Sequence, residues 1–425
     1  RVSRRPFALY YIDLDRFKTI NDGLGHHFGD RLLQAVSRRL QNAIGGGDTV
    51  SRLGGDEFAI LQIGIDSAAE AMPFSERINR LLHEPFVIDG LEVITSASIG
   101  VTFYPRDGES ADELLQNADL AMYRVKARGR NSSEFFTHEM LSQAREAIRV
   151  QSLLRGALAR REFVLHYQPQ IDLETGRLVG VEALIRWPQE SGPMLTPAEF
   201  LPIAEESDIM RPIDEWVLRE ACRQAKDWLD RLGRPIRVAV NLSARTFRDR
   251  NMSRLVLAIL EETGLPPSLL DLELTEGVLL DQAESATREA DVLHKRGVHL
   301  SIDDFGTGHS SLARLTSLHI DTLKIDRSFV CNLSEPNNMA IIRAVVSLGR
   351  ALDVQVLAEG VETAYQLGQV RQAGCSLVQG YFTGYPMSAV ELEHFLQRHE
   401  VSGALEAVGA VWHANQEGQT PWLAP

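Results

Sequence analysis

The sequence predicts an α/β protein of two domains, an N-terminal α/β sandwich with a mixed sheet followed by a (β/α)8 TIM-like barrel. Its length of 425 residues favours two or three domains. In the first part of the chain, strand-like and helical segments follow the order β-α-β-β-α-β, which is typical of a mixed sheet covered by helices. In the second part, eight short apolar runs alternate with helical patterns, as they do in a barrel.

The N-terminal domain is expected over residues 1–137, and it opens with an uninterrupted apolar strand at 7–12. Apolar residues at helical spacing predict a helix over 29–44. Two strands, 49–53 and 58–63, flank a Gly-containing turn and predict a β-hairpin. A helix (68–82), a strand (93–101), a helix (111–127) and a short strand (134–136) complete the domain. Because only six residues precede the first strand, we expect the domain to be truncated at its start.

A linker helix is predicted over residues 138–160, where helix formers run without Gly or Pro as far as Gly156. The barrel domain is expected over 161–402. Its predicted strands are 163–167, 178–184, 236–240, 270–274, 298–302, 322–325, 354–358 and 376–378, with helices such as 214–232, 283–296 and 338–352 between them. Residues 403–425 leave this pattern and are expected to form a C-terminal tail.

The composition excludes several classes of protein. Hydrophobic residues make up 44% and charged residues 24%, as in globular proteins and unlike disordered or collagen-like chains. No apolar run approaches the roughly 20 residues that span a bilayer, so we expect no membrane contact within this sequence. With 44 basic and 58 acidic residues the net charge is −14, which argues against a DNA or RNA polymer as partner.

The three cysteines, Cys222, Cys331 and Cys375, lie far apart and form no CxxC pair. A disulfide framework or a cysteine-based zinc site is therefore not expected. This cysteine usage favours a reducing, cytoplasmic location. If a full-length protein is anchored to the inner membrane, we expect segments outside this sequence to anchor it.

Polar residues stand at or just past the end of every predicted barrel strand. In a barrel these ends meet at one mouth. A single such residue is usually a helix cap or half of a salt bridge, but eight in phase favour a functional site. They are Gln168, Glu182, Asn241, Glu273, the pair Asp303 and Asp304, Lys324, Glu359 and Gln379.

Oxygen ligands without cysteine or clustered histidine favour a hard cation such as Mg²⁺ or Mn²⁺. The ligands in this set are Glu182, Asn241, Glu273, Asp303 and Asp304. Two adjacent aspartates repel each other unless cations lie between them. Two metal ions at such a site activate water against a phosphodiester, and Lys324 would then stabilise the charge of the transition state. Glu359 is expected either to bind the second metal or to orient the water.

The segment 304–311 contains two glycines and small polar residues. This composition suits a mobile loop over the site, and it suits an ordinary turn between strand and helix equally well.

The segment Glu182-Ala-Leu-Ile-Arg-Trp187 resembles the signature of the EAL-domain cyclic di-GMP phosphodiesterases, and the resemblance extends over about residues 145–400. Further motifs match in order: Tyr167-Gln-Pro, Asn241-Leu-Ser, Glu273-Leu-Thr-Glu276, Asp303-Asp-Phe-Gly-Thr-Gly308, Leu323-Lys-Ile-Asp326, Glu359-Gly-Val-Glu362 and Gln379-Gly-Tyr.

The resemblance implies hydrolysis of cyclic di-GMP to linear pGpG with two Mg²⁺ or Mn²⁺ ions, bound by the five oxygen ligands named above. It implies that Lys324 and Glu359 assist the attacking water and that Glu276 stabilises the loop. Gln168, Arg186 and Gln379 would hold the substrate. The alternative is a non-catalytic cyclic di-GMP receptor or scaffold, which would be expected to lose metal ligands that this sequence retains.

In the first domain, the hairpin turn carries Asp56 and Glu57 beside two glycines. Hairpins favour such residues for structural reasons alone. Asp13 ends the first strand, however, and with Asp56 it would form a two-carboxylate Mg²⁺ site for a nucleoside triphosphate. Lys126, at the end of the helix 111–127, and Arg130, just after it, are expected either to contact phosphates or only to complement the C-terminus of that helix.

These residues resemble the GGDEF diguanylate cyclases, as do Asp13-Leu-Asp-Arg-Phe-Lys18 and the segment 118–131. The resemblance implies a nucleotidyl-cyclase-like fold that binds GTP with Mg²⁺ on Asp13 and Asp56. Glu57 would assist the 3′-hydroxyl, and Lys126 and Arg130 would hold phosphates. Asn21 and Asp30 would read guanine. It also implies a homodimer, because synthesis needs two such domains face to face.

Whether this half synthesises cyclic di-GMP or only senses GTP stays open at this point. The family has an inhibitory product site with the motif Arg-x-x-Asp. At the corresponding position this chain has Gly45-Gly-Gly-Asp48, with glycine in place of the arginine. Because the arginine clamp is missing, the sequence predicts no product inhibition at that site.

Overall fold

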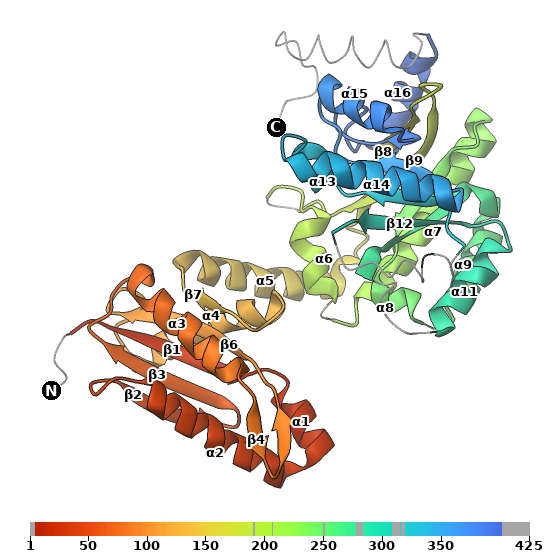
Figure 1. Cartoon of the computed structure of the whole chain (residues 1–425). Coiled ribbons are helices and arrows are strands. Elements are labelled where there is room, and N and C mark those ends of the chain that lie inside the picture. The colour runs from red at the N-terminus through yellow and green to blue at the C-terminus, as the bar shows by residue number, and fades with distance from the viewer. Residues whose placement is uncertain are drawn as a thin grey trace. The chain divides into compact units, whose positions relative to one another are not determined.

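The computed structural model (Figure 1) describes residues 5–189, 192–205, 207–249, 251–277, 284–307, 315 and 319–401. The chain divides into two compact units, Arg1–Arg149 and Val150–Pro425. Among the described helices, none combines the length and the apolar composition that crossing a bilayer requires.

The first unit contains a five-stranded sheet with the order β2-β3-β1-β6-β7. Its strands are β1 (Phe7–Leu14), β2 (Thr49–Gly54), β3 (Glu57–Ile63), β6 (Ala97–Tyr104) and β7 (Ser133–Phe135). The central strand β1 pairs antiparallel with both β3 and β6, whereas β7 runs parallel to β6. The mixed sheet and the β2–β3 hairpin are therefore as predicted.

Helices cover both faces of this sheet, which makes the unit a sandwich (Figure 1). The helices are α1 (Phe17–Leu24), α2 (His26–Ala43), α3 (Ala68–His83) and α4 (Ala111–Ala127). Alternate residues of β1 face opposite sides: Tyr10 and Ile12 pack in the core with α2 and α3, and Leu9 packs with Leu114 of α4. The period-2 side-chain alternation of a strand thus divides the core into two layers.

Two elements of this unit differ from the sequence prediction. The helix α1 was not predicted, and the expected strand at 93–101 is β6, which begins only at Ala97. The apolar residues before it belong to a small separate hairpin, β4 (Phe86–Ile88) with β5 (Leu91–Val93). Ile94 is 59% exposed, so this part of the apolar run does not mark a buried strand.

The predicted linker helix is α5 (His138–Ala157), which ends three residues earlier than expected. Met140 near its start packs with Ala121 and Phe136 of the first unit. Val150 and Leu154, in its last part, belong to the core of the second unit. The helix therefore contributes apolar residues to both cores.

The second unit is a closed eight-stranded barrel in the order β10-β11-β12-β13-β14-β15-β8-β9. Its strands are β8 (Val164–Asp172), β9 (Leu178–Arg186), β10 (Arg237–Asn241), β11 (Leu270–Thr275), β12 (His299–Phe305), β13 (Thr322–Ile325), β14 (Gln355–Ala358) and β15 (Leu377–Val378). The helical elements around it are α6 (Pro197–Glu205), α7 (Met210–Leu232), α8 (Ala244–Phe247), α9 (Met252–Thr263), the short 3₁₀ helix Pro267–Leu269, α11 (Glu284–His294), α13 (Arg327–Cys331), α14 (Pro336–Leu352), α15 (Ala364–Ala373) and α16 (Ala389–Val401).

The barrel prediction is confirmed, with one difference in strand direction. Strand β8 runs antiparallel to both of its neighbours, β9 and β15, while the other neighbouring strands pair in parallel. It extends to Asp172, so Gln168 lies in the middle of β8 and not at its end. A short turn joins β8 to β9 because antiparallel neighbours need no helical crossover.

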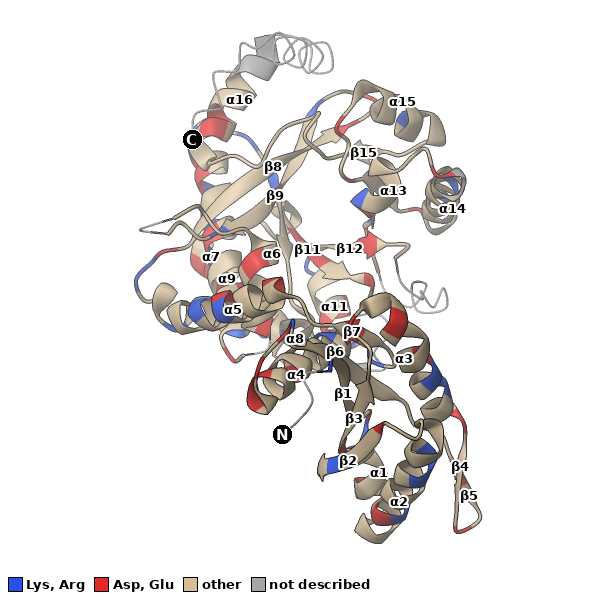
Figure 2. Ribbon diagram, turned by 90° about the vertical axis from the view of Figure 1, so that its left-hand side faces the viewer, with Lys and Arg blue, Asp and Glu red and all other residues tan. Residues whose placement is uncertain are grey.

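Charged residues on the surface helices are largely paired with one another. On α7, for example, Lys226 forms an ion pair with Asp230, and Arg231 with Asp227, each four residues apart. Figure 2 colours basic and acidic residues along the ribbon, and both kinds occur on the helices of the first unit. On α7 these pairs leave no continuous basic stripe.

Candidate active site

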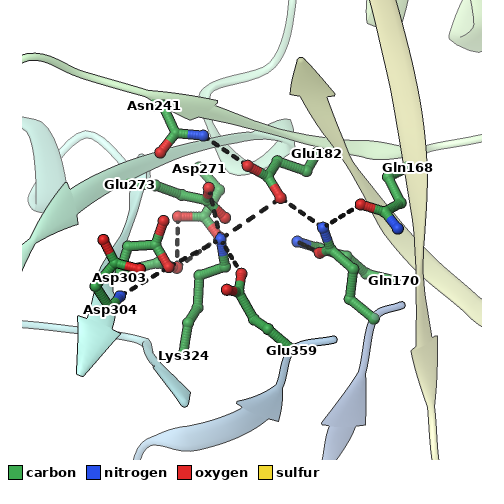
Figure 3. A network of polar contacts seen from close by, with 12 residues as sticks. Gln168, Gln170, Glu182, Asn241, Asp271, Glu273, Asp303, Asp304, Lys324 and Glu359 are labelled. Carbon is green, nitrogen blue, oxygen red and sulfur yellow. Dashed lines mark hydrogen bonds and ion pairs between the residues drawn. The ribbon is translucent and has the colours of Figure 1, made fainter. Parts of the chain in front are cut away.

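A single buried lysine lies at the centre of the barrel site (Figure 3). Lys324 on β13 is 1% exposed, and its Nζ approaches carboxylate oxygens from four other strands or strand ends. The distances from Nζ are 2.7 Å to Glu359, 2.8 Å to Glu273, 3.3 Å to Asp303 and 3.6 Å to Glu182. The barrel therefore brings five residues predicted from separate motifs within direct contact of one another.

Glu182 on β9 is held from both sides by amide donors. Asn241 Nδ2 donates to its Oε1 at 2.6 Å, and Gln379 Nε2 donates to its Oε2. Gln379 also donates to Gln168 Oε1 at 3.1 Å, and Gln168 pairs with Glu182 across the antiparallel β8–β9 ladder. The reversed strand β8 thus places Gln168 beside Glu182 from the middle of a strand.

A β-bulge at the end of β12 explains how two adjacent aspartates lie at one mouth. Neighbouring residues of a regular strand face opposite sides. The register of β12 with β13 shifts between Ile302 and Phe305, both of which pack outward against the helices. Asp304 is the extra residue, with a φ of 55°, and its backbone N–H donates to Asp303 Oδ1 at 2.9 Å. Such strain in a non-glycine residue is typical of functional sites.

The carboxylates titrate differently because they differ in burial and partners. Burial and the neighbouring Glu182 raise the pKa of Glu273 well above its usual range, although Lys324 opposes the rise. Burial also raises the pKa of Glu359 to about 8, and burial with Asp303 raises that of Asp304 to about 6. For Glu182, burial acts in the same direction, but Lys324, Gln379 and Asn241 outweigh it and lower the pKa.

The donor set fits divalent cations on two observations. In the described part of the chain, Asp303, Asp304 and Glu359 form one group in which one carboxylate oxygen from each residue lies within 4.8 Å of the other two. Glu273 Oε1 is buried and has no hydrogen-bond donor. Oxygen-only ligands and excess negative charge around a single lysine suit a hard cation such as Mg²⁺ or Mn²⁺.

Two predicted residues lie at the edge of this cluster. Arg186 ends β9, is half-buried, and donates to the carbonyl of Ile185 at 2.9 Å. Glu276 is 3% exposed, and its Oε2 accepts from the backbone N–H of Gly306 at 2.8 Å. Glu276 thus contacts the start of the predicted loop 304–311. Residues 308–311 of that loop lie outside the described residues.

In the first unit, Asp13 and Glu57 are direct partners in the β1–β3 ladder. Lys126 Nζ from α4 lies 2.8 Å from Asp13 Oδ2. Burial raises the pKa of Asp13; Lys126 opposes this rise and Asp56 adds to it. Gly55 supplies the left-handed residue of the hairpin turn, with a φ of 51°. The fold therefore gathers three carboxylates and one ammonium at one end of the sheet.

The predicted guanine-reading residues lie on α1 and α2. The Asn21 side chain lies so close to Gly29 that a Cβ added there would be 1.8 Å from Asn21 Oδ1. Asn21 Oδ1 is buried without a donor, whereas the next residue after Gly29, Asp30, is exposed. Arg130 follows α4 on an exposed turn, and no contact to Asp13 or Lys126 is present.

Sequence reasoning missed two buried polar residues below the barrel mouth. Gln170 Nε2 donates to Gln379 Oε1 at 3.1 Å, and Asp271 accepts two contacts of 2.8 Å from Ser301 Oγ. Both lie two residues from a predicted site residue on the same strand. The period of two along a strand, which brings alternate residues to the same face, could have identified them.

The comparisons with known proteins agree with this architecture. The model of the family described as "EAL domain" matches residues 151–386, and that described as "Diguanylate cyclase, GGDEF domain" matches residues 1–132. Proteins that carry these two domains in tandem form one class. The chain belongs to this family of GGDEF–EAL proteins.

Among its relatives is the bifunctional diguanylate cyclase/cyclic di-GMP phosphodiesterase MucR of Pseudomonas aeruginosa, 43% identical over 389 residues, which cover 91% of this chain and 57% of MucR. The cyclic di-GMP phosphodiesterase PdeR of Escherichia coli is 37% identical over 394 residues, covering 92% of this chain and 59% of PdeR. The chain thus spans little more than half the length of these relatives.

A solved structure of the PaMucR phosphodiesterase in complex with c-di-GMP also resembles the chain. It has a TM-score of 0.56 and 43% identity, covering 57% of this chain and 99% of that structure.

Proposed function

We propose that the barrel hydrolyses cyclic di-GMP to linear pGpG with two divalent ions, Mg²⁺ or Mn²⁺. The observation that carries the proposal is the convergence of Glu182, Glu273, Asp303 and Glu359 on Lys324 at one end of the barrel. The EAL family match and the MucR structure with bound c-di-GMP support the same substrate. A non-catalytic receptor is disfavoured because it would not need this set of ligands.

The metal ions would be held by Glu182, Asn241, Glu273, Asp303 and Asp304, with Glu359 as a further ligand or as the residue that orients the water. When bound, such ions act as Lewis acids and lower the pKa of water.

The remaining roles fall to the chain's own side chains. Glu359 would take up a proton from the attacking water, and the Lys324 ammonium would stabilise negative charge that develops on the phosphate. Gln168, Arg186 and Gln379 would hold the substrate, while Glu276 would fix the loop through the Gly306 N–H.

For the first unit we propose binding of GTP with Mg²⁺ on Asp13 and Asp56, with phosphates on Lys126 and Arg130 and guanine on Asn21 and Asp30. Glu57 would assist the 3′-hydroxyl if the bound GTP is a substrate. Synthesis of cyclic di-GMP would require a homodimer, because each domain brings one GTP. A purely regulatory GTP site needs no second copy, so the two alternatives differ in a measurable way.

Chromatography of nucleotides after incubation of the chain with cyclic di-GMP, and separately with GTP, tests both halves. We expect pGpG from cyclic di-GMP in Mg²⁺ or Mn²⁺, no product after chelation with EDTA, and recovery when the metal is returned. Hydrolysis that persists in metal-free buffer would contradict the metal-dependent mechanism. Cyclic di-GMP formed from GTP would identify synthesis, whereas binding of GTP without product would favour a sensor.

Glu182→Ala tests the assignment of a single ligand. We expect the turnover of cyclic di-GMP to fall at least about a hundredfold, since the carboxylate would be lost from the metal site. Circular dichroism should show a retained fold. The matched control is Glu199→Ala, which removes a carboxylate that caps α6 through the Thr196 N–H at 2.6 Å, and its turnover should stay near that of the parent. Equal turnover in both variants would refute the role of Glu182.

A further inference from the structure

A strained turn follows α4 in the first unit. Gly129, Arg130 and Asn131 have φ angles of 112°, 68° and 51°. Non-glycine residues are uncommon in this left-handed region, although asparagine enters it more often than arginine, and helices usually enter it with one glycine. Part of the turn is fixed by the Arg130 N–H, which donates to the Val125 carbonyl at 2.9 Å. The other part requires a second restraint.

Asp15 supplies that restraint from beneath the turn. Its Oδ2 accepts from the backbone N–H of Asn131 at 3.2 Å and from Ser96 Oγ at 2.6 Å, and its Oδ1 accepts from Ser98 Oγ at 2.7 Å. Asp15 is only 6% exposed. The carboxylate is therefore held by two serine hydroxyls at the start of β6, and it holds the turn through one backbone amide.

The turn carries a cation without an ionic partner, next to the residue Asn131 that Asp15 holds. Within the described residues, the exposed Arg130 guanidinium has no carboxylate or carbonyl partner, whereas the guanidinium of Arg128 pairs with Glu134 at 3.1 Å. Asp15 lies two residues after Asp13, the proposed metal ligand at the end of β1. The hydrogen bond to Asp15 therefore connects the turn to this end of the strand.

We propose that Asp15 is a positioning residue, which holds the strained turn so that Arg130 is pre-organised for the phosphates of a nucleoside triphosphate. This inference rests on the proposed binding of GTP. A guanidinium on a fixed turn loses less freedom when it binds phosphate than one on a loose loop. Without Asp15 the turn would relax toward negative φ and carry Arg130 away.

Isothermal titration of the full chain with a non-hydrolysable GTP analogue in Mg²⁺ tests the proposal, with guanosine as a second probe that lacks phosphates. We expect Asp15→Ala and Arg130→Ala each to weaken binding of the analogue about tenfold, as the loss of a charge-assisted contact does. Binding of guanosine should not change. The double variant should lose little more than either single variant, since both remove the same contact.

Asn131→Gly provides a rescue that a general structural role of Asp15 would not show. Glycine adopts the observed φ without strain, so adding Asn131→Gly to Asp15→Ala should recover most of the lost affinity. Asp107→Asn is the matched control: Asp107 is equally buried and accepts from the Phe103 N–H at 2.8 Å, away from the turn. Its affinity for the analogue should equal that of the parent.

Three results would overturn the proposal: unchanged binding in Asp15→Ala, equal losses for analogue and guanosine, or no rescue by Asn131→Gly. If Asp15→Ala fails to fold, Asp15→Asn retains the side-chain volume and is measured against the same two probes. A parent chain that binds neither probe would overturn the proposed GTP site together with this inference. A parent that binds the analogue and is insensitive to Asp15 overturns the inference alone.

Discussion

At the scale of single residues, the barrel site is defined by an imbalance of charge. One ammonium, Lys324, faces four carboxylates at 2.7 to 3.6 Å. These neighbours hold the pKa of Lys324 well above its usual range, although burial acts in the opposite direction. Even with Lys324 charged, ionisation of all four carboxylates would leave excess buried negative charge. That excess is the physical reason to expect divalent cations here.

Position 45 offers a test at this scale. Asp48 of the altered product-site motif accepts from the Gly45 N–H at 3.2 Å, and a Cβ at Gly45 would meet only the Asp48 carboxylate at an ordinary 3.4 Å. Gly45→Arg should therefore be tolerated. We expect it to strengthen binding of cyclic di-GMP to the first unit about tenfold, because a guanidinium pairs well with phosphate.

Calorimetry of Gly45→Arg in the Glu182→Ala background separates this site from the barrel's own turnover of the ligand. Gly45→Lys is the matched control, since it adds charge without the bidentate geometry. Equal affinities for the arginine variant and its parent would remove the basis for a product site at this position.

At the scale of elements, the bulge of β12 places the candidate metal ligand Asp304 in the site, and the backbone conformation that this requires lowers the stability of the fold. Asp304 has a φ of 55°, which glycine adopts freely. Asp304→Gly should therefore raise the free energy of unfolding of metal-free protein by up to about 1 kcal/mol, while turnover of cyclic di-GMP falls at least about tenfold. Asp304→Ala should lose turnover without the gain in stability, because alanine keeps the strain.

Chemical denaturation without metal, paired with activity in Mn²⁺, measures both effects for the two variants. If the glycine and alanine variants had the same stability, the left-handed conformation of residue 304 would not be a source of strain.

At the scale of the whole molecule, the stability of the barrel should depend on pH and metal together. Burial raises the folded-state pKa of Glu359 to about 8, and that of Asp304 to about 6. An acid whose pKa is raised on folding stabilises the fold fully below its unfolded pKa, near 4, and this contribution is lost as pH rises through the folded value. Metal-free protein should therefore lose stability from about pH 4 to pH 8.

Bound Mn²⁺ should reduce that loss, because the metal replaces protons on the same carboxylates. The gain in Tm on adding Mn²⁺ is thus expected to grow between pH 6 and pH 8 in thermal denaturation. Glu359→Gln should flatten the metal-free dependence in the upper half of this range. A gain in Tm that is constant with pH would contradict the assignment of these carboxylates to the metal site.

The domain limits at 137 and 160, the homodimer and the cytoplasmic location stay predictions for the whole molecule. The internal contacts of the chain divide it into two compact units at residues 149 and 150. Helix α5 contributes apolar residues to the cores of both units. Gel filtration with light scattering, with and without the GTP analogue, measures the predicted dimer.

The sequence alone determined the residue types at the strand ends and the periodic patterns of the strands, and these were sufficient for the two folds and the family. It determined them because alternation and helical spacing are local properties of a chain. The Glu182 and Asp303-Asp304 motifs were readable for the same reason, since each lies within a few consecutive residues.

Only the tertiary structure decided the reversed direction of β8, the central place of Lys324 and the bulge that turns Asp304 toward the mouth. Each depends on pairing between strands far apart in the sequence, and a shift of one residue would reverse which side chains face inward. The hydrogen bond from the Asn131 N–H to Asp15, which lies 116 positions away in the chain, could not be predicted for the same reason. Local patterns predict which side chains are available, and long-range pairing determines which of them meet.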